Sequence, residues 1–306
     1  MSRLLFALMT LFFAHAACAE VLDVGPGKTY PELQAAEAAA KPGDTLRLTT
    51  GEHFDCLVVH RADLIIEGSG KPEDTSLTDK ACQGKGLLVI QAANVTVRNL
   101  TLTRVRVPDG NGAGIRAEAT GLLVDHVRFV NNQDGLLAGN IPDGTITVRD
   151  SEFLRNGACN PSCAHGIYVG RIKLLRVIHS RFFETKQAHH VKSRAEQTEV
   201  IDSDLQDGPN GTSSYAIDVS NGGGVLVRGC TIEKGPNSEN HSGAIVIGAE
   251  GVTQRTPAIR IEGNTFRRDG DYPTAFVVNM TATEAELVGN KIAPGIKPLN
   301  GDGSVH

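Results

Sequence analysis

Side chains that can move protons or hold anionic groups recur in the middle of this chain at nearly equal intervals. Tyr168, Lys192 and Asp218 are separated by 24 and 26 residues, and Arg194 follows Lys192 by two positions. His165 precedes Tyr168 by three positions. If a repeating fold stacks these positions on one face, then a base, an acid and fixed positive charge meet at one place.

Such a set suits the removal of the weakly acidic proton that lies beside the carboxylate of a uronate sugar. This step needs positive charge to neutralise the carboxylate, a base, and an acid for the leaving oxygen. We predict that Lys192 or His165 is the base, with its pKa lowered by cationic neighbours. Arg194 is predicted to grip the carboxylate, and Tyr168 or Tyr215 to donate to the leaving oxygen.

Further polar residues are expected around this group. Asp218 is predicted to orient Lys192 or to contact sugar hydroxyls, although a surface ion pair of little energetic value is the plainer interpretation. The residues predicted to bind substrate are Arg116, Glu118, Asp134, His189, Asn221 and Glu239.

An internal repeat is what would position these residues. One pattern is an apolar residue, any residue, a small polar residue or Gly, two residues, then an apolar residue; its copies start at Val97, Val124, Val148, Val177, Val200, Val227 and Ile261. A second pattern, a small residue followed by apolar alternation, starts at Gly114, Gly135, Gly166, His190, Ala216, Ala244 and Ala275. Two short strands and one variable loop per repeat predict a parallel β-helix.

The two patterns predict about eight or nine coils of roughly 27 residues each. Alternation along the second strand places one inward row, Ile115, Leu136, Ile167, Val191, Ile217 and Ile245. The neighbouring outward row is predicted as Arg116, Leu137, Tyr168, Lys192, Asp218, Val246 and Val277. A polar ladder at Ser151, Ser180, Ser203, Cys230 and Asn264 is expected to bond turn backbone. Residues 29–40 are predicted to form a helix that covers the first coil.

The chain resembles the pectate-lyase-like superfamily, and within it a group of bacterial right-handed β-helix repeat proteins without a settled activity. The stretches that carry the resemblance are Val24-Gly-Pro-Gly-Lys-Thr-Tyr30, Ala40-Lys-Pro-Gly-Asp-Thr45, Ile65-Ile-Glu-Gly-Ser-Gly70 and His165-Gly-Ile-Tyr-Val-Gly170. The resemblance implies an all-β, single-stranded right-handed parallel β-helix. The superfamily includes lyases, epimerases, glycoside hydrolases, esterases and tailspikes, so it does not fix the reaction.

The first 19 residues are predicted to be a signal peptide. Arg3 precedes an apolar run from Leu4 to Phe13, and Ala17-Cys-Ala19 has the small residues of a cleavage site. We therefore expect cleavage after Ala19, a β-helix domain over 20–306, and a periplasmic or secreted protein. The mature chain would hold 29 basic and 35 acidic residues, which disfavours nucleic-acid binding, and no later stretch predicts a membrane span.

Export makes disulfides plausible for the cysteines that follow the leader. We predict one bond between Cys56 and Cys82, one coil apart, and a second between Cys159 and Cys163 inside one loop. Cys230 is predicted to be a buried thiol. Zinc binding by the Cys159–Cys163 loop with His165 is an alternative, as is a metal bound by the adjacent pair His189-His190.

The sequence thus predicts an exported protein that binds an acidic polysaccharide or oligosaccharide, acting as a lyase or a C5-epimerase. No cofactor is predicted, with Ca²⁺ as an alternative, and the chain is expected to be a monomer. One alternative is a glycoside hydrolase, which would need two facing carboxylates. Another is a structural or glycan-binding β-helix without catalysis, although the absence of Trp disfavours neutral-sugar binding.

Overall fold

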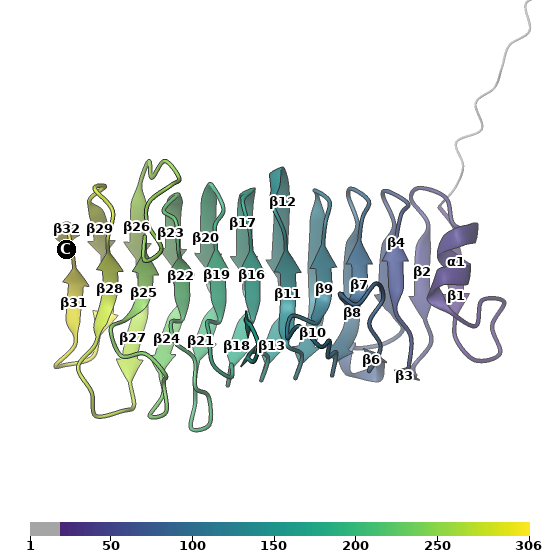
Figure 1. Cartoon of the computed structure of the whole chain (residues 1–306), viewed down its shortest axis with the longest axis horizontal. Coiled ribbons are helices and arrows are strands. Elements are labelled where there is room, and N and C mark those ends of the chain that lie inside the picture. The colour runs from purple at the N-terminus through teal and green to yellow at the C-terminus, as the bar shows by residue number, and fades with distance from the viewer. Residues whose placement is uncertain (1–18) are drawn as a thin grey trace, which may run out of the picture.

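The chain winds into a solenoid of parallel strands. The computed structural model describes residues 19–306, and the predicted signal peptide lies almost entirely outside them. Successive coils lie side by side along the long axis of the molecule in sequence order (Figure 1). Every pairing in the two large sheets is parallel, as the all-β β-helix prediction requires.

Three rows of strands make up the wall. The first row contains β1 (Val21–Val24), β2 (Thr45–Leu48), β5 (Ile65–Gly68), β8 (Thr96–Thr103), β10 (Leu122–Val130), β12 (Ile141–Arg149), β17 (Ile172–Ile178), β20 (Gln197–Ile201), β23 (Gly224–Arg228), β26 (Ile259–Glu262), β29 (Ala285–Val288) and β32 (Gly303–Val305). The second contains β3 (Gly51–His53), β6 (Thr75–Thr78), the second halves of β8 and β10, β13 (Glu152–Leu154), β18 (Arg181–Phe183), β21 (Asp204–Gln206), β24 (Thr231–Lys234), β27 (Thr265–Arg268) and β30 (Lys291–Ile292).

The third row is a separate ten-stranded sheet, and it carries the predicted site. Its strands are β4 (Leu57–Val59), β7 (Gly86–Ile90), β9 (Ala113–Ala117), β11 (Asp134–Ala138), β16 (Ile167–Val169), β19 (Val191–Ser193), β22 (Ile217–Val219), β25 (Gly243–Ile247), β28 (Ala275–Asn279) and β31 (Lys297–Asn300). The solenoid therefore has about ten coils rather than eight or nine, because β4, β7 and β31 belong to coils without the second sequence pattern.

The prediction of two strands per coil was wrong, because the first sequence pattern spans a corner between two rows. Its third residue has a positive φ in every copy: Asn99, His126, Asp150, His179, Asp202, Gly229 and Gly263. Asn, Asp, His and Gly tolerate this left-handed conformation better than other residues do. The third residue of the pattern therefore bends the chain. It lies within the long strands β8 and β10 and separates two strands in the later copies.

The residue after each of the last five corners belongs to the predicted polar ladder. The Ser180 hydroxyl accepts the backbone N–H of Ser151 at 3.3 Å, and the Ser203 hydroxyl accepts that of Ser180 at 3.1 Å. Asn264 does the same for the backbone N–H of Cys230 at 2.9 Å. The ladder is structural, as predicted, because its side chains satisfy turn backbone inside the wall.

The interior is filled by stacked apolar rows. The predicted row Ile115, Leu136, Ile167, Val191, Ile217 and Ile245 is aligned strand to strand and fully buried. Phe129, Phe153 and Phe182 form a second stack, with ring centroids 4.4 and 4.6 Å apart. A Cβ at Gly135 would lie 2.7 Å from the Phe153 ring, so the glycine that opens the second sequence pattern lets the ring approach the backbone.

A short helix and one disulfide secure the N-terminal end. The helix α1 (Leu33–Ala39) packs beside β1, β2 and β4 and buries Leu33 and Ala36. It covers the first coil as predicted (Figure 1), but it is shorter than the predicted 29–40, since the chain enters it through extended backbone at Glu32. A one-turn 3-10 helix spans Pro72–Asp74. The predicted bond between Cys56 and Cys82 is present.

Removal of the central ring of the aromatic stack should destabilise the solenoid. We expect Phe153→Ala to lower the free energy of unfolding by about 3–5 kcal/mol, because it deletes a fully buried ring between two others. Phe54→Ala is the matched control, since that ring is 57% exposed. Urea unfolding followed by circular dichroism measures both, and equal losses for the two variants would contradict the stack.

Candidate functional site

The predicted outward stack is present on the third row of strands. Tyr168 of β16 pairs in register with Lys192 of β19, which pairs with Asp218 of β22. The next outward residue is Val246 of β25. The prediction failed one strand later, where Val278 rather than Val277 is aligned with Val246. The row is thus polar from β16 to β22, and Leu137 and Val246 flank this part.

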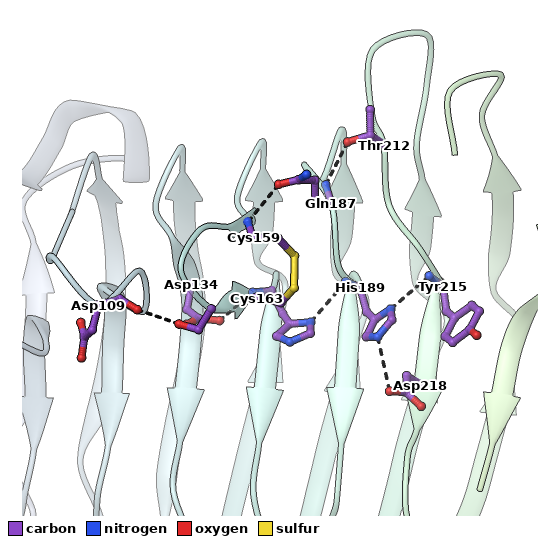
Figure 2. Close-up of a disulfide and its surroundings, with 11 residues drawn as sticks. Asp109, Asp134, Cys159, Cys163, Gln187, His189, Thr212, Tyr215 and Asp218 are labelled. Carbon is purple, nitrogen blue, oxygen red and sulfur yellow. Dashed lines mark hydrogen bonds and ion pairs between the residues drawn. A yellow bond between two sulfur atoms is a disulfide. The ribbon is translucent and has the colours of Figure 1, made fainter. Parts of the chain in front are cut away.

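A second ladder runs across the coils at the start of these strands (Figure 2). The backbone N–H of His165 donates to the Asp134 carboxylate at 2.6 Å. The backbone N–H of His189 donates to Nδ1 of His165 at 3.2 Å, and that of Tyr215 donates to Nδ1 of His189 at 3.1 Å. Each side chain therefore binds the backbone of the next coil, and the rings of His165, His189 and Tyr215 stack 5.1 and 5.0 Å apart.

This ladder fixes the protonation of both imidazoles. Because Nδ1 of each ring accepts a backbone N–H, a neutral ring carries its proton on Nε2. Burial, followed by the charges of neighbouring cations, holds the pKa of His165 well below its ordinary value. Burial also lowers the pKa of His189 to about 4, although Asp218 opposes the shift. Both rings are hydrogen-bond donors at neutral pH, which disfavours the predicted use of His165 as a base.

Lys192 is a buried ammonium held by two carboxylates. Its Nζ donates to Asp218 Oδ2 at 2.9 Å and to Glu250 Oε1 at 2.5 Å, and the residue is 8% exposed. Burial alone would lower its pKa, but Asp218 and Glu250 outweigh burial and raise it. The prediction of a lowered pKa for Lys192 was therefore wrong, because the sequence did not reveal the second carboxylate.

Arg194 uses all three of its guanidinium nitrogens within the site. Nε donates to the Tyr168 hydroxyl at 3.0 Å, Nη1 to the amide oxygen of Asn221, and Nη2 to Glu250 Oε2 at 2.5 Å. Asn221 in turn donates to the carbonyl of Gly251 at 2.9 Å. The contacts give Asn221 the role of holding Arg194 against the loop that carries Glu250.

Glu250 is the residue that sequence reasoning missed. It lies in the loop after β25, and its carboxylate bridges Lys192 and Arg194 while its side chain stays 42% exposed. Burial would raise its pKa, but the two cations outweigh burial and lower it. The loop has no counterpart in the coil repeat, so the repeat gave no register that could have placed Glu250 above Lys192.

These residues line an open cleft of about 680 Å³. Its walls include His165, Tyr168, His189, Lys192, Glu239 and Glu250. Asp218 lies beneath the floor and is 2% exposed; its Oδ2 accepts from Lys192 and Ser220 and lies 3.4 Å from His189 Nε2. Glu239 is exposed and enters from the long loop before β25. The Tyr215 hydroxyl accepts from Asn240 at 3.0 Å, on the side facing that loop.

The other predicted substrate-binding residues lie toward the N-terminal side of this cleft. Arg116 and Asp134 line a second cleft of about 300 Å³, which shares Tyr168 and Cys163 with the first. Glu118 is paired with Lys85 at 2.6 Å. The stack therefore brings together the predicted catalytic residues. Arg116, Glu118 and Asp134 lie on a separate part of the same face.

A disulfide-closed hairpin stands between the two clefts. Strands β14 (Ala158–Cys159) and β15 (Cys163–Ala164) are antiparallel, and the predicted bond between Cys159 and Cys163 joins them (Figure 2). The Cys159 backbone N–H donates to Gln187 at 2.9 Å, and the Ser162 hydroxyl donates to the Asp109 carbonyl at 2.6 Å. Cys230 is buried and unpaired within residues 19–306, as predicted.

The cysteine and histidine residues that the sequence offered as alternative metal ligands do not converge on one metal position within residues 19–306. The two cysteines of the hairpin are bonded to each other. His190 faces the interior, fully buried, while His189 lines the cleft, so the adjacent pair does not converge. Asp125, His126 and Asp150 gather at a corner away from the cleft, but Asp125 already pairs with Arg149 at 2.7 Å. No helix within residues 19–306 is long and apolar enough to cross a membrane.

No protein-family model and no curated protein matches the sequence. Solved structures match the fold. The crystal structure of pectate lyase Pel9A has 12% identity and a TM-score of 0.56 over 91% of this chain and 78% of that chain. The alginate lyase from Paenibacillus sp. str. FPU-7 has 18% identity and a TM-score of 0.57 over 93% and 99%. Escherichia coli YbhC has 14% identity and a TM-score of 0.54 over 87% and 88%.

The chain has the right-handed parallel β-helix fold of these proteins. The prediction of a pectate-lyase-like β-helix is thereby confirmed at the level of fold. At 12 to 18% identity the similarity says nothing of which side chains act.

The neutral state of His189 gives a pH-dependent prediction. Folding lowers its pKa from the ordinary value to about 4, so at intermediate pH only the unfolded chain binds this proton. Its contribution to stability is complete above about pH 6.5 and is lost as the pH falls toward about 4. Nitrogen NMR of labelled histidine should show the Nε2–H form of His189 at neutral pH.

A variant of the neighbouring acid tests the cause of this shift. Asp218→Asn should lower the pKa of His189 further, because the Asp218 charge is what opposes the effect of burial. A cationic His189 at pH 6, or a proton on Nδ1, would contradict the ladder geometry.

Proposed function

We propose that this chain is an exported enzyme that acts on a uronate-containing glycan by removing the proton beside the sugar carboxylate. That step is common to β-elimination and C5 epimerisation. The observation that carries the proposal is the carboxylate of Glu250, which is held between Lys192 and Arg194 in the main cleft. The chain itself thus supplies the chemical group that an acidic sugar would bring.

A sugar carboxylate could take the place of Glu250. Glu250 is on a loop and 42% exposed, whereas Lys192 sits on β19 and Arg194 directly follows that strand. Two cations that already bind carboxylate oxygens would neutralise the substrate carboxylate and stabilise the charge that builds when the adjacent proton leaves. The raised pKa of Lys192 suits this electrostatic role better than the role of base.

Tyr168 is the group best placed to move the proton. It lines the main cleft, and Arg194 donates to its hydroxyl oxygen at 3.0 Å, which leaves the hydroxyl hydrogen available to the substrate. The guanidinium would stabilise negative charge on that oxygen. In an elimination, Tyr168 would first lose its hydroxyl proton to solvent. Its oxygen then takes the C5 proton as the C4–C5 double bond forms and the C4–O bond breaks, and it returns that proton to the leaving oxygen.

The structural neighbours and the disulfides support the proposal without deciding it. Two of the matched structures are named as lyases of pectate and of alginate, and the reasoning from them is by analogy of fold. Two disulfides in one chain fit an oxidising compartment outside the cytoplasm. Hydrolysis is less well supported in the main cleft, because it needs a protonated carboxyl facing a second carboxylate, whereas both cations lower the pKa of Glu250 and Asp218 is buried beneath the floor.

A glycan-binding protein without catalysis is a second candidate. One observation favours it: Lys192 is ion-paired and both histidines accept backbone N–H groups through Nδ1, so the proposed proton transfer depends on Tyr168. Such a protein would hold an acidic glycan through the same two cations.

The reaction should be visible with defined uronate polymers. The mature chain is incubated with polygalacturonate, polymannuronate and polyguluronate. We expect either new ultraviolet absorbance from unsaturated ends or, by NMR, inverted C5 centres. Reducing ends without unsaturation would replace the proposal by hydrolysis. Tight binding without any product would replace it by the binding function.

Two tyrosine variants separate the proton donors predicted from the sequence. Tyr168→Phe should lower kcat by about 10²–10⁴-fold, because it deletes the hydroxyl that Arg194 contacts. Tyr215→Phe should change kcat far less, since the Tyr215 hydroxyl bonds to Asn240 and its ring can still stack on His189. Initial rates on the active polymer measure both, and the reverse order would move the proton transfer to Tyr215.

Glu250→Gln tests whether this side chain competes with substrate. We expect tighter binding of an acidic oligosaccharide, because the variant frees Lys192 and Arg194 from a charged carboxylate. Glu239→Gln is the matched control: it removes the same charge from the same cleft, but Glu239 is not paired with either cation in the described chain. Calorimetry should give a several-fold gain for the first variant only. Equal gains would assign the effect to net charge.

A further inference from the structure

The second cleft contains a cation, Arg116, that makes a long ion pair but no hydrogen bond among the described residues. Arg116 projects from β9 into this cleft of about 300 Å³, and its side chain is 23% exposed. Its Nε is buried and has no hydrogen-bond partner among the described residues. The nearest carboxylate, Glu118, lies 3.6 Å from Nε but is bound more closely by Lys85 at 2.6 Å and Gln91 at 2.8 Å.

Such an arrangement is costly unless a ligand completes it. A buried donor without an acceptor loses the hydrogen bonds that water would give it. The contrast with Arg194 is direct, because all three nitrogens of Arg194 have acceptors. Arg116 is therefore the guanidinium of this face that is ready to bind an added anion.

The rest of the second cleft suits a sugar acid. Asn111 and Asn140 offer amide groups, and Leu137 of β11 adds an apolar side chain to the lining. Gly139 adds no side chain, and a Cβ built there would meet nothing within 4 Å. Burial raises the pKa of Asp134 well above its ordinary value, and the residue is only 1% exposed, so it presents little surface to an anion in the cleft.

The register of the strands sets the spacing between the two clefts. Arg116 is aligned with Leu137, Leu137 with Tyr168, and Tyr168 with Lys192. Three coil spacings separate Arg116 from Lys192, or about 14 Å along the solenoid axis. Tyr168 and Cys163 line both clefts, so the two clefts adjoin.

We propose that the second cleft is a subsite in which Arg116 binds the carboxylate of a sugar more than one unit away from the reacting one. The substrate is accordingly an oligomer with repeated acidic units, bound along the solenoid axis. This inference rests on the proposed function, since it takes an acidic glycan to be the ligand of the main cleft.

Affinity as a function of chain length tests the subsite. Defined oligogalacturonates and oligoalginates, from two to six units, are titrated by calorimetry into the mature wild-type chain and its variants. Wild-type affinity should rise once the oligomer reaches both clefts. Arg116→Gln should weaken the binding of long oligomers by about tenfold in Kd and leave the Kd of short oligomers unchanged. Where turnover is measurable, KM should rise for long oligomers with kcat retained.

Two further variants make the result independent of folding defects at Arg116. Gly139→Leu fills the second cleft without changing charge, and should also weaken only the long oligomers. Arg181→Gln removes an equal charge from an exposed position on β18, outside both clefts, and should change nothing.

The outcomes separate this inference from the proposed function. Equal affinities of wild type and Arg116→Gln at every length would overturn the subsite while leaving the main cleft intact. An equal loss for length-matched neutral oligosaccharides would overturn the carboxylate contact. A wild-type chain that binds no acidic oligomer of any length would overturn the proposed function, and the subsite with it.

Discussion

Parallel stacking of coils in register is the constraint on which the rest of this structure depends. Each coil can satisfy its backbone only by pairing with the coils before and after it, so equivalent positions must lie directly above one another. Residues far apart in sequence, such as Tyr168, Lys192 and Asp218, thereby become neighbours. The same rule that builds the aromatic and serine ladders of the interior also builds the polar face.

The histidine ladder shows how structure and chemistry are combined in one set of bonds. Where the chain turns into the third row, its N–H groups lack strand partners, and Asp134, His165 and His189 accept them instead. These bonds hold the coil corners and at the same time leave Nε2 as the protonated nitrogen of both rings, which in His189 lies 3.4 Å from Asp218 Oδ2. Replacement of either ring would therefore alter the wall and the cleft together, which makes variants of Tyr168 and Glu250 more informative.

The sequence predicted those parts of the site that follow the repeat and missed those that do not. The register of Tyr168, Lys192 and Asp218 could be predicted because each lies two positions after the start of a copy of the second sequence pattern. The sequence showed the residue at each left-handed corner as the third position of the first pattern, but it did not show that this residue has a positive φ. The strands on either side of the corner were therefore predicted as one strand. Glu250 lies in a loop without a repeated counterpart, and no local pattern shows that it reaches back to Lys192. Without it, the pKa of Lys192 was assigned the wrong direction.

The spacing of the coils has a consequence for how such a surface changes over time. A binding face assembled from equivalent turns grows or shrinks only by whole turns, so its reach changes in discrete increments of about 4.8 Å. Duplication of one coil between Arg116 and Lys192 would leave both local environments intact and move them one increment further apart. The number of turns then sets, in whole steps, the length of ligand that the face can bind. The side chains of each turn adjust the affinity at that turn separately.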